Sequence, residues 1–255
     1  MSKLLEGKQA LILGIANRWS LAYAIAQAFS REGATLVLSY LNERFKPALE
    51  ELAQGLNVRK LLACDVTKEE DLEQLSAELK DMGQLDAVVH SLAFANREDL
   101  GRPFMETPRA GFLIAQEVSA YSLVAVARAT VPAMTAGGSI TTLTYVGSTR
   151  VVPNYNVMGV AKASLEAATR YLASDLGPQK IRVNALSAGP VKTASARAVK
   201  DFSTILDVVA TRAPLRHNTD PAEVADTAVF LASDLGRGVT GNTLFVDSGM
   251  QIMGL

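Results

Sequence analysis

Two polar residues with an unusual spacing, Tyr155 and Lys162, stand seven positions apart, and Tyr145 precedes them by ten. A helix turns ~100° and rises ~1.5 Å per residue, so Tyr155 and Lys162 would lie on one face, about two turns and ~10 Å apart. That span is too long for an ordinary contact between neighbouring turns and suits one elongated ligand. We therefore expect the lysine to bind one part of a ligand and the phenol another.

Composition limits the classes of protein to consider. The chain has 255 residues, 49% of them hydrophobic, and its 25 Lys and Arg against 26 Asp and Glu provide no basic field for nucleic acid. The N-terminus has no apolar signal core, and no uninterrupted apolar run approaches the ~20 residues of a membrane span. A lone Cys64 and two histidines, His90 and His217, offer no metal-ligand spacing. We expect a cytoplasmic protein with no membrane segment, bound metal or nucleic-acid partner.

Short apolar runs alternate with longer segments of helical periodicity, a pattern typical of βαβ units around a parallel sheet. No repeat, low-complexity tract or linker interrupts this alternation. The pattern predicts an α/β fold in which residues 1–255 form a single-domain, doubly wound, Rossmann-like sheet with helices on both faces. The seven predicted strands are residues 10–13, 35–38, 58–63, 85–89, 139–143, 181–186 and 243–246.

Capping residues mark where helices begin. One helix should follow Ser20, with its apolar face from Leu21 to Phe29. Thr67 and Glu70 predict a capping box before a leucine stripe, and Asp220 with Glu223 predicts another.

A nucleotide would bind where the first predicted strand ends. In such folds the turn after this strand faces the ligand crevice, and the next helix offers free N–H groups to a pyrophosphate. Here the turn runs from Gly14 to Ser20 and departs from the pattern G-x-G-x-x-G, because Gly14 is its only glycine. An alternative is that Gly14 only makes a tight turn and Ser20 only caps a helix. We expect Trp19 to serve packing.

Two further strand ends point into the same crevice. Asp65 could accept a hydrogen bond from an adenine amino group or, equally, cap the next helix. His90 is expected to be buried and hydrogen-bonded, whereas Ala93 and Ala95 are small enough to let a ring approach the backbone.

The segment after the second strand bears on the choice of cofactor. Residues 39–44 meet neither the rule of an acid for NAD nor that of a basic residue for NADP cleanly, and no basic residue stands at Leu41 or Asn42. We predict NADH, and Arg44 leaves NADPH open.

With these residues in place, the chain resembles the short-chain dehydrogenase/reductase superfamily, and more narrowly the bacterial NADH-type enoyl-acyl carrier protein reductases of fatty acid synthesis. The resemblance runs from about Gly7 to Gly249. It is carried by Tyr145, by the segment from Tyr155 to Glu166 and by the loop from Ser187 to Pro190. In two departures, Leu41 stands where several relatives have a polar residue, and Ala93 replaces a common glycine.

The resemblance implies that Lys162 holds the nicotinamide ribose and also makes the Tyr155 phenol more acidic. It implies that Tyr155 hydrogen-bonds the thioester carbonyl, and that Tyr145 shapes the pocket or supports that contact; Tyr145 could instead simply close a strand end. The implied cofactor-binding residues are Gly14, Ser20, Leu21, Leu41, Asp65, Val66, Leu92, Lys162, Val191, Thr193, Ala194 and Ser195. The implied substrate-binding residues are Ala93, Ala95, Tyr145, Tyr155, Met158, Val199 and Phe202.

The same resemblance implies an enoyl-acyl carrier protein substrate, a homotetramer and a substrate loop at about residues 190–216. Most of that loop could instead be a surface helix. Its basic residues, Arg197, Lys200, Arg212 and Arg216, suit docking of an acidic carrier protein, although solvated surface charge is the better account of any single one.

Two other functions compete with this hypothesis. Carbonyl or 3-oxoacyl reductases of the superfamily have a tyrosine four residues before the lysine, where this chain has Met158. A non-catalytic dinucleotide sensor could have the same fold, because a fold alone does not establish chemistry. Both Tyr155 and Lys162 are present, which favours an enzyme.

Overall fold

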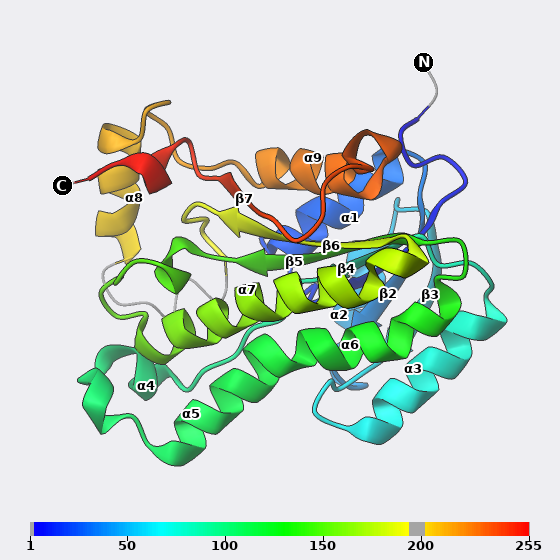
Figure 1. The fold of residues 1–255 in the computed structure, drawn as a ribbon, viewed down its shortest axis with the longest axis horizontal. Coiled ribbons are helices and arrows are strands. Elements are labelled where there is room, and N and C mark those ends of the chain that lie inside the picture. The colour runs from blue at the N-terminus through cyan, green and yellow to red at the C-terminus, as the bar shows by residue number, and fades with distance from the viewer. Residues whose placement is uncertain (1–2, 194–201, 255) are drawn as a thin grey trace.

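The computed structural model describes residues 3–193 and 202–254 and shows a twisted sheet between two layers of helices (Figure 1). Its seven strands all pair in parallel, in the order β3-β2-β1-β4-β5-β6-β7. All seven predicted strands are confirmed, although the fourth begins and ends slightly later than expected. The strands are β1 (Gln9–Leu13), β2 (Thr35–Tyr40), β3 (Val58–Ala63), β4 (Ala87–His90), β5 (Gly138–Thr144), β6 (Ile181–Ala188) and β7 (Thr243–Val246).

Helices occupy most of the connections between these strands. They are α1 (Leu21–Arg31), α2 (Lys46–Ala53), α3 (Glu69–Asp81), α4 (Arg97–Gly101), α5 (Arg109–Gln116), α6 (Ser122–Thr130), α7 (Asn156–Leu176), α8 (Phe202–Arg212) and α9 (Pro221–Ala232). A π-helical turn, Glu117–Tyr121, joins α5 to α6.

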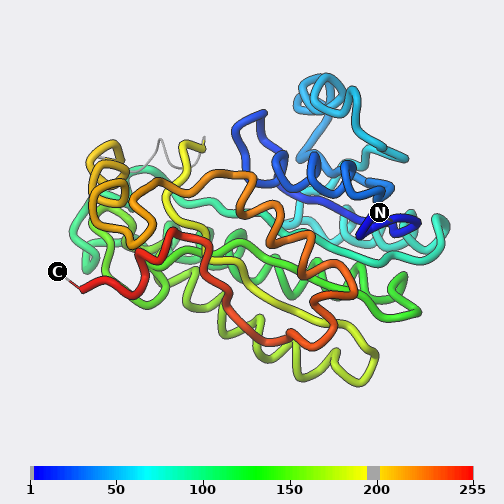
Figure 2. Tube along the Cα trace, turned by 90° about the horizontal axis from the view of Figure 1, so that it is seen from above, coloured from blue at the N-terminus to red at the C-terminus, as the bar shows by residue number. Residues whose placement is uncertain are grey.

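The two faces of the sheet bury separate apolar clusters. Ala10 and Ile12 of β1 pack in the cluster that contains α1 and α9, whereas Leu11 and Leu13 pack in the cluster of α3, α6 and α7. Successive strand residues point to opposite faces, and each of these four side chains is at most 1% exposed. The helices α1 and α9 lie against each other on one face, as Figure 2 shows from above. Such continuous apolar strands are typical of a parallel sheet covered on both sides.

The strand order places the ends of β1 and β4 side by side, at the point where the chain direction across the sheet reverses. The amide of Ser91 donates to the carbonyl of Leu13 at 3.2 Å. Gly14 has φ +98°, and a Cβ there would lie 2.1 Å from the carbonyl oxygen of Ser91. Only glycine fits this close approach, so the turn brings the two strand ends together at the crevice expected for a ligand.

The start of α9 confirms one predicted capping box, and the start of α3 contradicts the other. Asp220 accepts from the amide of Ala222 at 2.8 Å, while Glu223 accepts from the amide of Asp220 at 3.0 Å, as predicted. The box at Thr67 is wrong, because the Thr67 hydroxyl donates to Asp65 at 2.7 Å and α3 begins at Glu69 without a side-chain cap. The Thr67 hydroxyl points to the carboxylate of Asp65, two residues earlier, and accepts no hydrogen bond from the amides of α3.

One helical stretch, Arg109–Ala133, is long and apolar enough to cross a membrane by length and composition alone. Half of its apolar window is buried inside the protein. Core helices of proteins without any membrane segment pass the same test.

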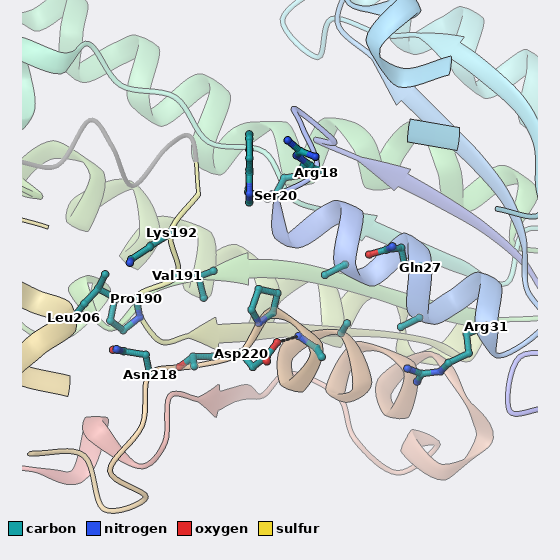
Figure 3. A pocket seen from close by; sticks show the side chains of 17 residues that line it. Arg18, Ser20, Gln27, Arg31, Pro190, Val191, Lys192, Leu206, Asn218 and Asp220 are labelled. Atoms are coloured by element: carbon teal, nitrogen blue, oxygen red, sulfur yellow. Dashed lines mark hydrogen bonds between the residues drawn. The ribbon is translucent and has the colours of Figure 1, made fainter. Parts of the chain in front are cut away.

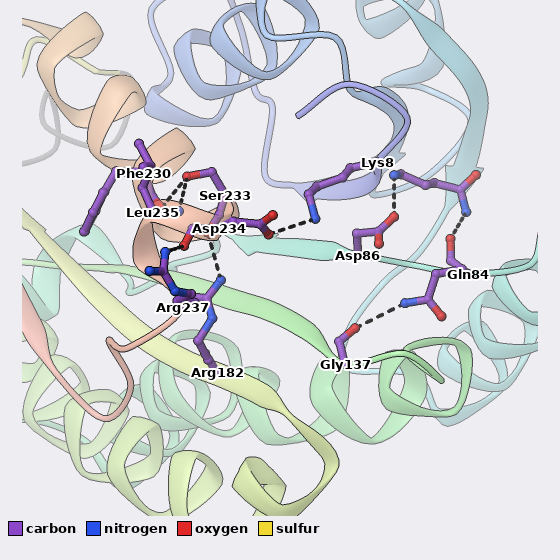
Figure 4. A network of polar contacts seen from close by, with 11 residues as sticks. Lys8, Gln84, Asp86, Gly137, Arg182, Phe230, Ser233, Asp234, Leu235 and Arg237 are labelled. Atoms are coloured by element: carbon purple, nitrogen blue, oxygen red, sulfur yellow. Dashed lines mark hydrogen bonds and ion pairs between the residues drawn. The ribbon is translucent and has the colours of Figure 1, made fainter. Parts of the chain in front are cut away.

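A polar network ties together the opposite edge of the sheet, where the strands begin (Figure 4). Asp86 accepts from the amide of Gln9 at 2.8 Å, and Lys8 lies 3.5 Å from Asp234. Arg182 donates to the carbonyl of Ser233 at 3.4 Å. These contacts hold the ends of the strands that lie farthest from the crevice.

Candidate active site

The predicted pair lies at the start of α7. Tyr155 occupies the cap position immediately before the helix, and Lys162 lies within it, only 5% exposed. The helical spacing of the two residues is therefore nearly as expected, with Tyr155 one residue outside the helix.

Tyr145 lies beside Tyr155. Tyr145 directly follows β5 with extended backbone, and its ring meets that of Tyr155 edge-on, with the centroids 5.1 Å apart. Gly147 makes room for this arrangement, because a Cβ there would lie 2.5 Å from Cδ1 of Tyr155. The turn after β5 and the start of α7 thus position both phenols together.

Burial changes the acid–base behaviour of both tyrosines. It raises the pKa of Tyr155 well above its ordinary value of 10.0, and the nearby Tyr145 raises it further. Burial, followed by the charge of Asp247, also raises the pKa of Tyr145. The expectation that Lys162 makes the Tyr155 phenol more acidic is wrong for this structure, because desolvation dominates. Both phenols remain protonated at neutral pH and can donate hydrogen bonds.

Lys162 is a buried amine with a fixed direction. Its Nζ donates to the carbonyl oxygen of Leu143, at the end of β5, at 2.7 Å. Burial lowers its pKa from 10.5 to about 8, and the charge of Glu166 acts in the opposite sense. An ammonium has three donors, so two remain for a ligand beyond the Leu143 carbonyl.

His90 has the buried role that its sequence position suggested. It is 0% exposed, and its ring nitrogens lie 2.8 Å from the hydroxyls of Thr142 and Ser122. Burial and then the charge of Lys162 lower its pKa from 6.5 to about 3. The imidazole is therefore neutral at physiological pH and links β4, β5 and α6.

On the other side of the crevice, the start of α1 faces a cavity of about 690 Å³ (Figure 3). Arg18, Ser20, Val191 and Lys192 are among its lining residues. Ser20 occupies the cap position of α1, but its hydroxyl donates to the carbonyl of Asn17 at 2.7 Å, so it provides no side-chain cap. Ser20 thus stands at the cap position of α1 but leaves the first amides of the helix without a side-chain partner.

Trp19 differs from its expected role in packing. It is 48% exposed, and the guanidinium of Arg18 lies 4.7 Å from its ring centroid. Both side chains line the cavity at the start of α1.

The other predicted cofactor-binding residues lie along the ends of the strands. Asp65 and Val66 follow β3, where Asp65 accepts from both the amide and the hydroxyl of Thr67. Leu92 lies two residues beyond β4, and Leu41 directly follows β2 and is 47% exposed. Leu21 begins α1, and Thr193 donates through its amide to the carbonyl of Val191 at 2.7 Å. These residues follow the carboxyl ends of strands or begin the first helix.

Several predicted substrate-binding residues share one apolar cluster. Ala95 and Tyr155 pack against a buried cluster that contains Met158, which is 7% exposed, and Leu100. Ala93 lies two residues before Ala95 and is exposed, and Phe202 begins α8. Three predicted residues, Ala194, Ser195 and Val199, lie outside the described part of the chain, as do the basic residues Arg197 and Lys200.

Three residues next to the pair were not predicted from the sequence. Gly147 sets the position of the Tyr155 ring, and Glu166 accepts from the Thr144 hydroxyl at 2.7 Å with both side chains buried. A signal for Glu166 existed, because it follows Lys162 by one helical turn. No such signal marks Thr144 or Gly147, whose roles depend on the packing of β5 against α7.

The buried Lys162 contacts the end of β5 near two protonated phenols, and the first turn of α1 has no side-chain cap. On a doubly wound sheet this arrangement is typical of dinucleotide-dependent oxidoreductases. Comparison with known proteins agrees. The family model described as Enoyl-(Acyl carrier protein) reductase matches residues 14–251. The chain belongs to this family.

Relatives that match over nearly their whole length are named as enoyl-acyl carrier protein reductases. The chain is 52% identical to the enoyl-[acyl-carrier-protein] reductase [NADH] FabI of Bacillus cereus, over 99% of this chain and 100% of that protein. It is 51% identical to the corresponding enzyme of Staphylococcus aureus strain MRSA252, which is named for NADPH, over 97% and 98% of the two chains.

Solved structures give the same result. The Bacillus cereus reductase, crystallised with NADP+ and an indole naphthyridinone, superimposes with a TM-score of 0.97, and the match covers 99% of this chain and 100% of that one. The reductase of Aquifex aeolicus superimposes with a TM-score of 0.95 at 44% identity, over 99% of both chains.

Proposed function

We propose that this protein reduces the trans-2 double bond of enoyl thioesters on acyl carrier protein in fatty acid synthesis, with NADH as reductant. One observation carries the proposal. Tyr155 lies seven residues before Lys162 and against Tyr145, while the position four residues before the lysine holds the buried, apolar Met158.

The residues present fit a dinucleotide. Gly14 allows a close approach of backbone at the turn after β1, and the first turn of α1 has no side-chain cap. Those free amides suit a pyrophosphate, as at other helix N-termini. The two remaining donors of Lys162 suit the hydroxyls of a ribose. Asp65, Val66 and Leu92 would flank the adenine and ribose, and Val191 and Thr193 the nicotinamide and pyrophosphate.

The bound cofactor supplies the hydride, which is transferred to the β-carbon of the enoyl group. Conjugation then places negative charge on the thioester oxygen, whose carbon lies two carbons from that β-carbon, and addition of a proton at the α-carbon completes the reduction. Tyr155 donates a hydrogen bond to this oxygen, where charge is larger in the transition state than in the ground state. Its raised pKa keeps the proton on the phenol, so Tyr155 acts here as a donor. Tyr145 fixes the ring, and Met158 and Ala95 provide apolar contact for the acyl chain.

The spacing distinguishes this reaction from carbonyl reduction. In a ketone the oxygen is attached to the carbon that receives hydride, whereas in an enoyl thioester it lies two carbons farther along. A donor displaced by about one helical turn from the usual position matches that difference. Met158, which stands at the usual position, has no hydroxyl to donate, and this disfavours a carbonyl or 3-oxoacyl reductase.

A negative charge beyond β2 supports NADH over NADPH. The Tyr40 hydroxyl donates to Glu43 at 2.8 Å and so holds a carboxylate next to Leu41. In this fold the residues after β2 meet the adenosine ribose, and a carboxylate there repels a 2′-phosphate. The relatives named for NADH and for NADPH are about equally similar to this chain, so the choice depends on these residues.

The organisation of the molecule completes the proposal. The whole chain acts as one domain in the cytoplasm, and four copies assemble. A groove formed by α5, the π-helical turn, α6 and α7 supports assembly, because Leu113 and Tyr121, which line it, are 58% and 52% exposed.

Two exposed arginines, Arg212 at the end of α8 and Arg216 just after it, suit docking of an acidic carrier protein. If reversal of all four loop charges leaves the Michaelis constant for carrier-bound substrate unchanged, the carrier docks elsewhere.

The deciding experiment measures NADH oxidation with crotonyl thioester and 3-oxoacyl thioester as separate substrates. We expect oxidation that depends on the enoyl thioester. Activity with only the 3-oxoacyl thioester would identify a carbonyl reductase, and NADH binding without turnover would identify a sensor.

A further inference from the structure

Two charged side chains on successive turns of α7 are held by two adjacent residues of β5. Lys162 donates to the carbonyl oxygen of Leu143 at 2.7 Å, and Glu166 accepts from the hydroxyl of Thr144 at 2.7 Å. Residues four apart on a helix share a face, so both side chains point from α7 toward the end of β5. The strand therefore fixes the lysine and the glutamate relative to each other.

Both charged groups and the threonine that contacts one of them are buried: Lys162 is 5% exposed, Glu166 8% and Thr144 5%. Burying an ionised glutamate costs free energy unless an opposite charge and hydrogen bonds compensate it. A glutamine would keep the hydrogen bond from Thr144 with no such cost, so the hydrogen bond alone does not account for an acid at this position.

The charges around Lys162 come from two elements. Glu166, on α7 itself, favours the ammonium form, and burial opposes it. His90, on the adjacent strand β4, stays neutral because of its burial and the charge of Lys162. Glu166 thus opposes part of the desolvation of Lys162, beside the hydrogen bond to the Leu143 carbonyl.

We propose that Glu166 is a positioning residue that keeps the Lys162 amine protonated and directed at the cofactor ribose. It touches neither cofactor nor substrate and acts only through the lysine. The inference rests on the proposed function for the role of Lys162 toward the ribose, but the protonation of the lysine is measurable without any reaction.

The test compares Glu166→Gln with the unchanged protein. The titration of Lys162 is followed by NMR of protein labelled at lysine Cε, with the signal assigned by its loss in Lys162→Met. Binding of NADH is measured in parallel by fluorescence at pH 6 and pH 8.5. Asp175→Asn, which removes an exposed carboxylate from the same helix, is the matched control.

We expect Glu166→Gln to lower the midpoint of the Lys162 titration by about one pH unit or more, because a nearby opposite charge is lost. NADH affinity should fall several-fold at pH 8.5 and stay unchanged at pH 6, where the lysine is protonated in both proteins. Asp175→Asn should change neither measurement, and Glu166→Asp should restore most of the midpoint.

An unchanged titration midpoint in Glu166→Gln overturns the inference, and so does an equal loss of NADH affinity at both pH values, which indicates a merely structural role. Should Glu166→Gln fail to fold, Thr144→Val carries the test, because it releases the carboxylate and keeps its charge. In Thr144→Val the midpoint of the Lys162 titration should fall by less than in Glu166→Gln, and an unchanged midpoint overturns the inference. Failure of the enoyl assay would instead overturn the proposed function and leave the Lys162 titration intact.

Discussion

The ring of Tyr145 meets the ring of Tyr155 edge-on, with their planes at 70° and their centroids 5.1 Å apart. Edge-on pairs of this kind stabilise by about 0.5–1.5 kcal/mol beyond the area that they bury. The contact joins the end of β5 to the start of α7 and limits the rotation of both phenols. Tyr155 can therefore present its hydroxyl in one direction, as a donor to a substrate oxygen must.

Replacement of Tyr155 by Phe should lower turnover of enoyl thioesters by about 100-fold or more, since loss of one such donor typically costs ~3–4 kcal/mol of barrier. NADH affinity should stay nearly intact, because the proposal assigns the cofactor contact to Lys162. Steady-state kinetics and fluorescence titration measure the two effects. Tyr145→Phe is the matched comparison and should cost less, because the Tyr145 hydroxyl is not the proposed donor to the thioester oxygen. Unchanged turnover in Tyr155→Phe would remove this residue from the mechanism.

Gly147 should tolerate no larger side chain. A Cβ at this position would lie 2.5 Å from the Tyr155 ring, so Gly147→Ala must displace the phenol. A displacement of about 1 Å can cost ~100-fold in rate, and we expect a loss of that order in kcat. Gly177→Ala, where an added Cβ meets nothing within 4 Å, is the control. Wild-type kcat in Gly147→Ala would show that the position of this ring does not limit the reaction.

The buried His90 should make the protein sensitive to acid. Its pKa is about 3 in the folded protein and about 6.5 when unfolded, so between these values the unfolded chain binds the extra proton. Stability that is present above pH 6.5 is therefore lost as the pH falls toward 3, at up to about 1.4 kcal/mol per pH unit from this group. Urea unfolding at several pH values should show a shallower loss in His90→Asn than in the unchanged protein. Equal slopes in His90→Asn and the unchanged protein would contradict the prediction.

The carboxylate held by Tyr40 should influence the choice of cofactor. Glu43→Gln removes a negative charge near the expected position of a 2′-phosphate, and exposed charges of this kind contribute about 0.2–1 kcal/mol. The ratio of kcat/KM for NADPH to that for NADH should therefore rise a few-fold. Glu51→Gln, an exposed carboxylate on α2, should leave the ratio unchanged. A tenfold preference of the unchanged protein for NADPH would refute the choice of NADH itself.

Much of the fold could be predicted because its signals are local. Seven apolar runs separated by helical periodicity indicate a parallel sheet, and the capping box at Asp220 forms from residues within one turn of each other. The spacing of Tyr155 and Lys162 is similarly local, since both lie at or within the first two turns of α7. The failed capping box at Thr67 shows the limit of such signals, because Asp65 competes for the same hydroxyl.

The sequence by itself therefore determined the strands, the crevice and the two residues that mark the chemistry. Only the tertiary structure decided how those residues behave. The raised pKa of Tyr155 and the lowered pKa of Lys162 arise from burial, and burial depends on segments distant along the chain. The contacts of Lys162 with Leu143 and of Glu166 with Thr144 likewise join a helix to a strand about twenty residues away. Residue type and spacing set which groups are available, whereas the protonation and direction of each group depend on the packing of β5 against α7.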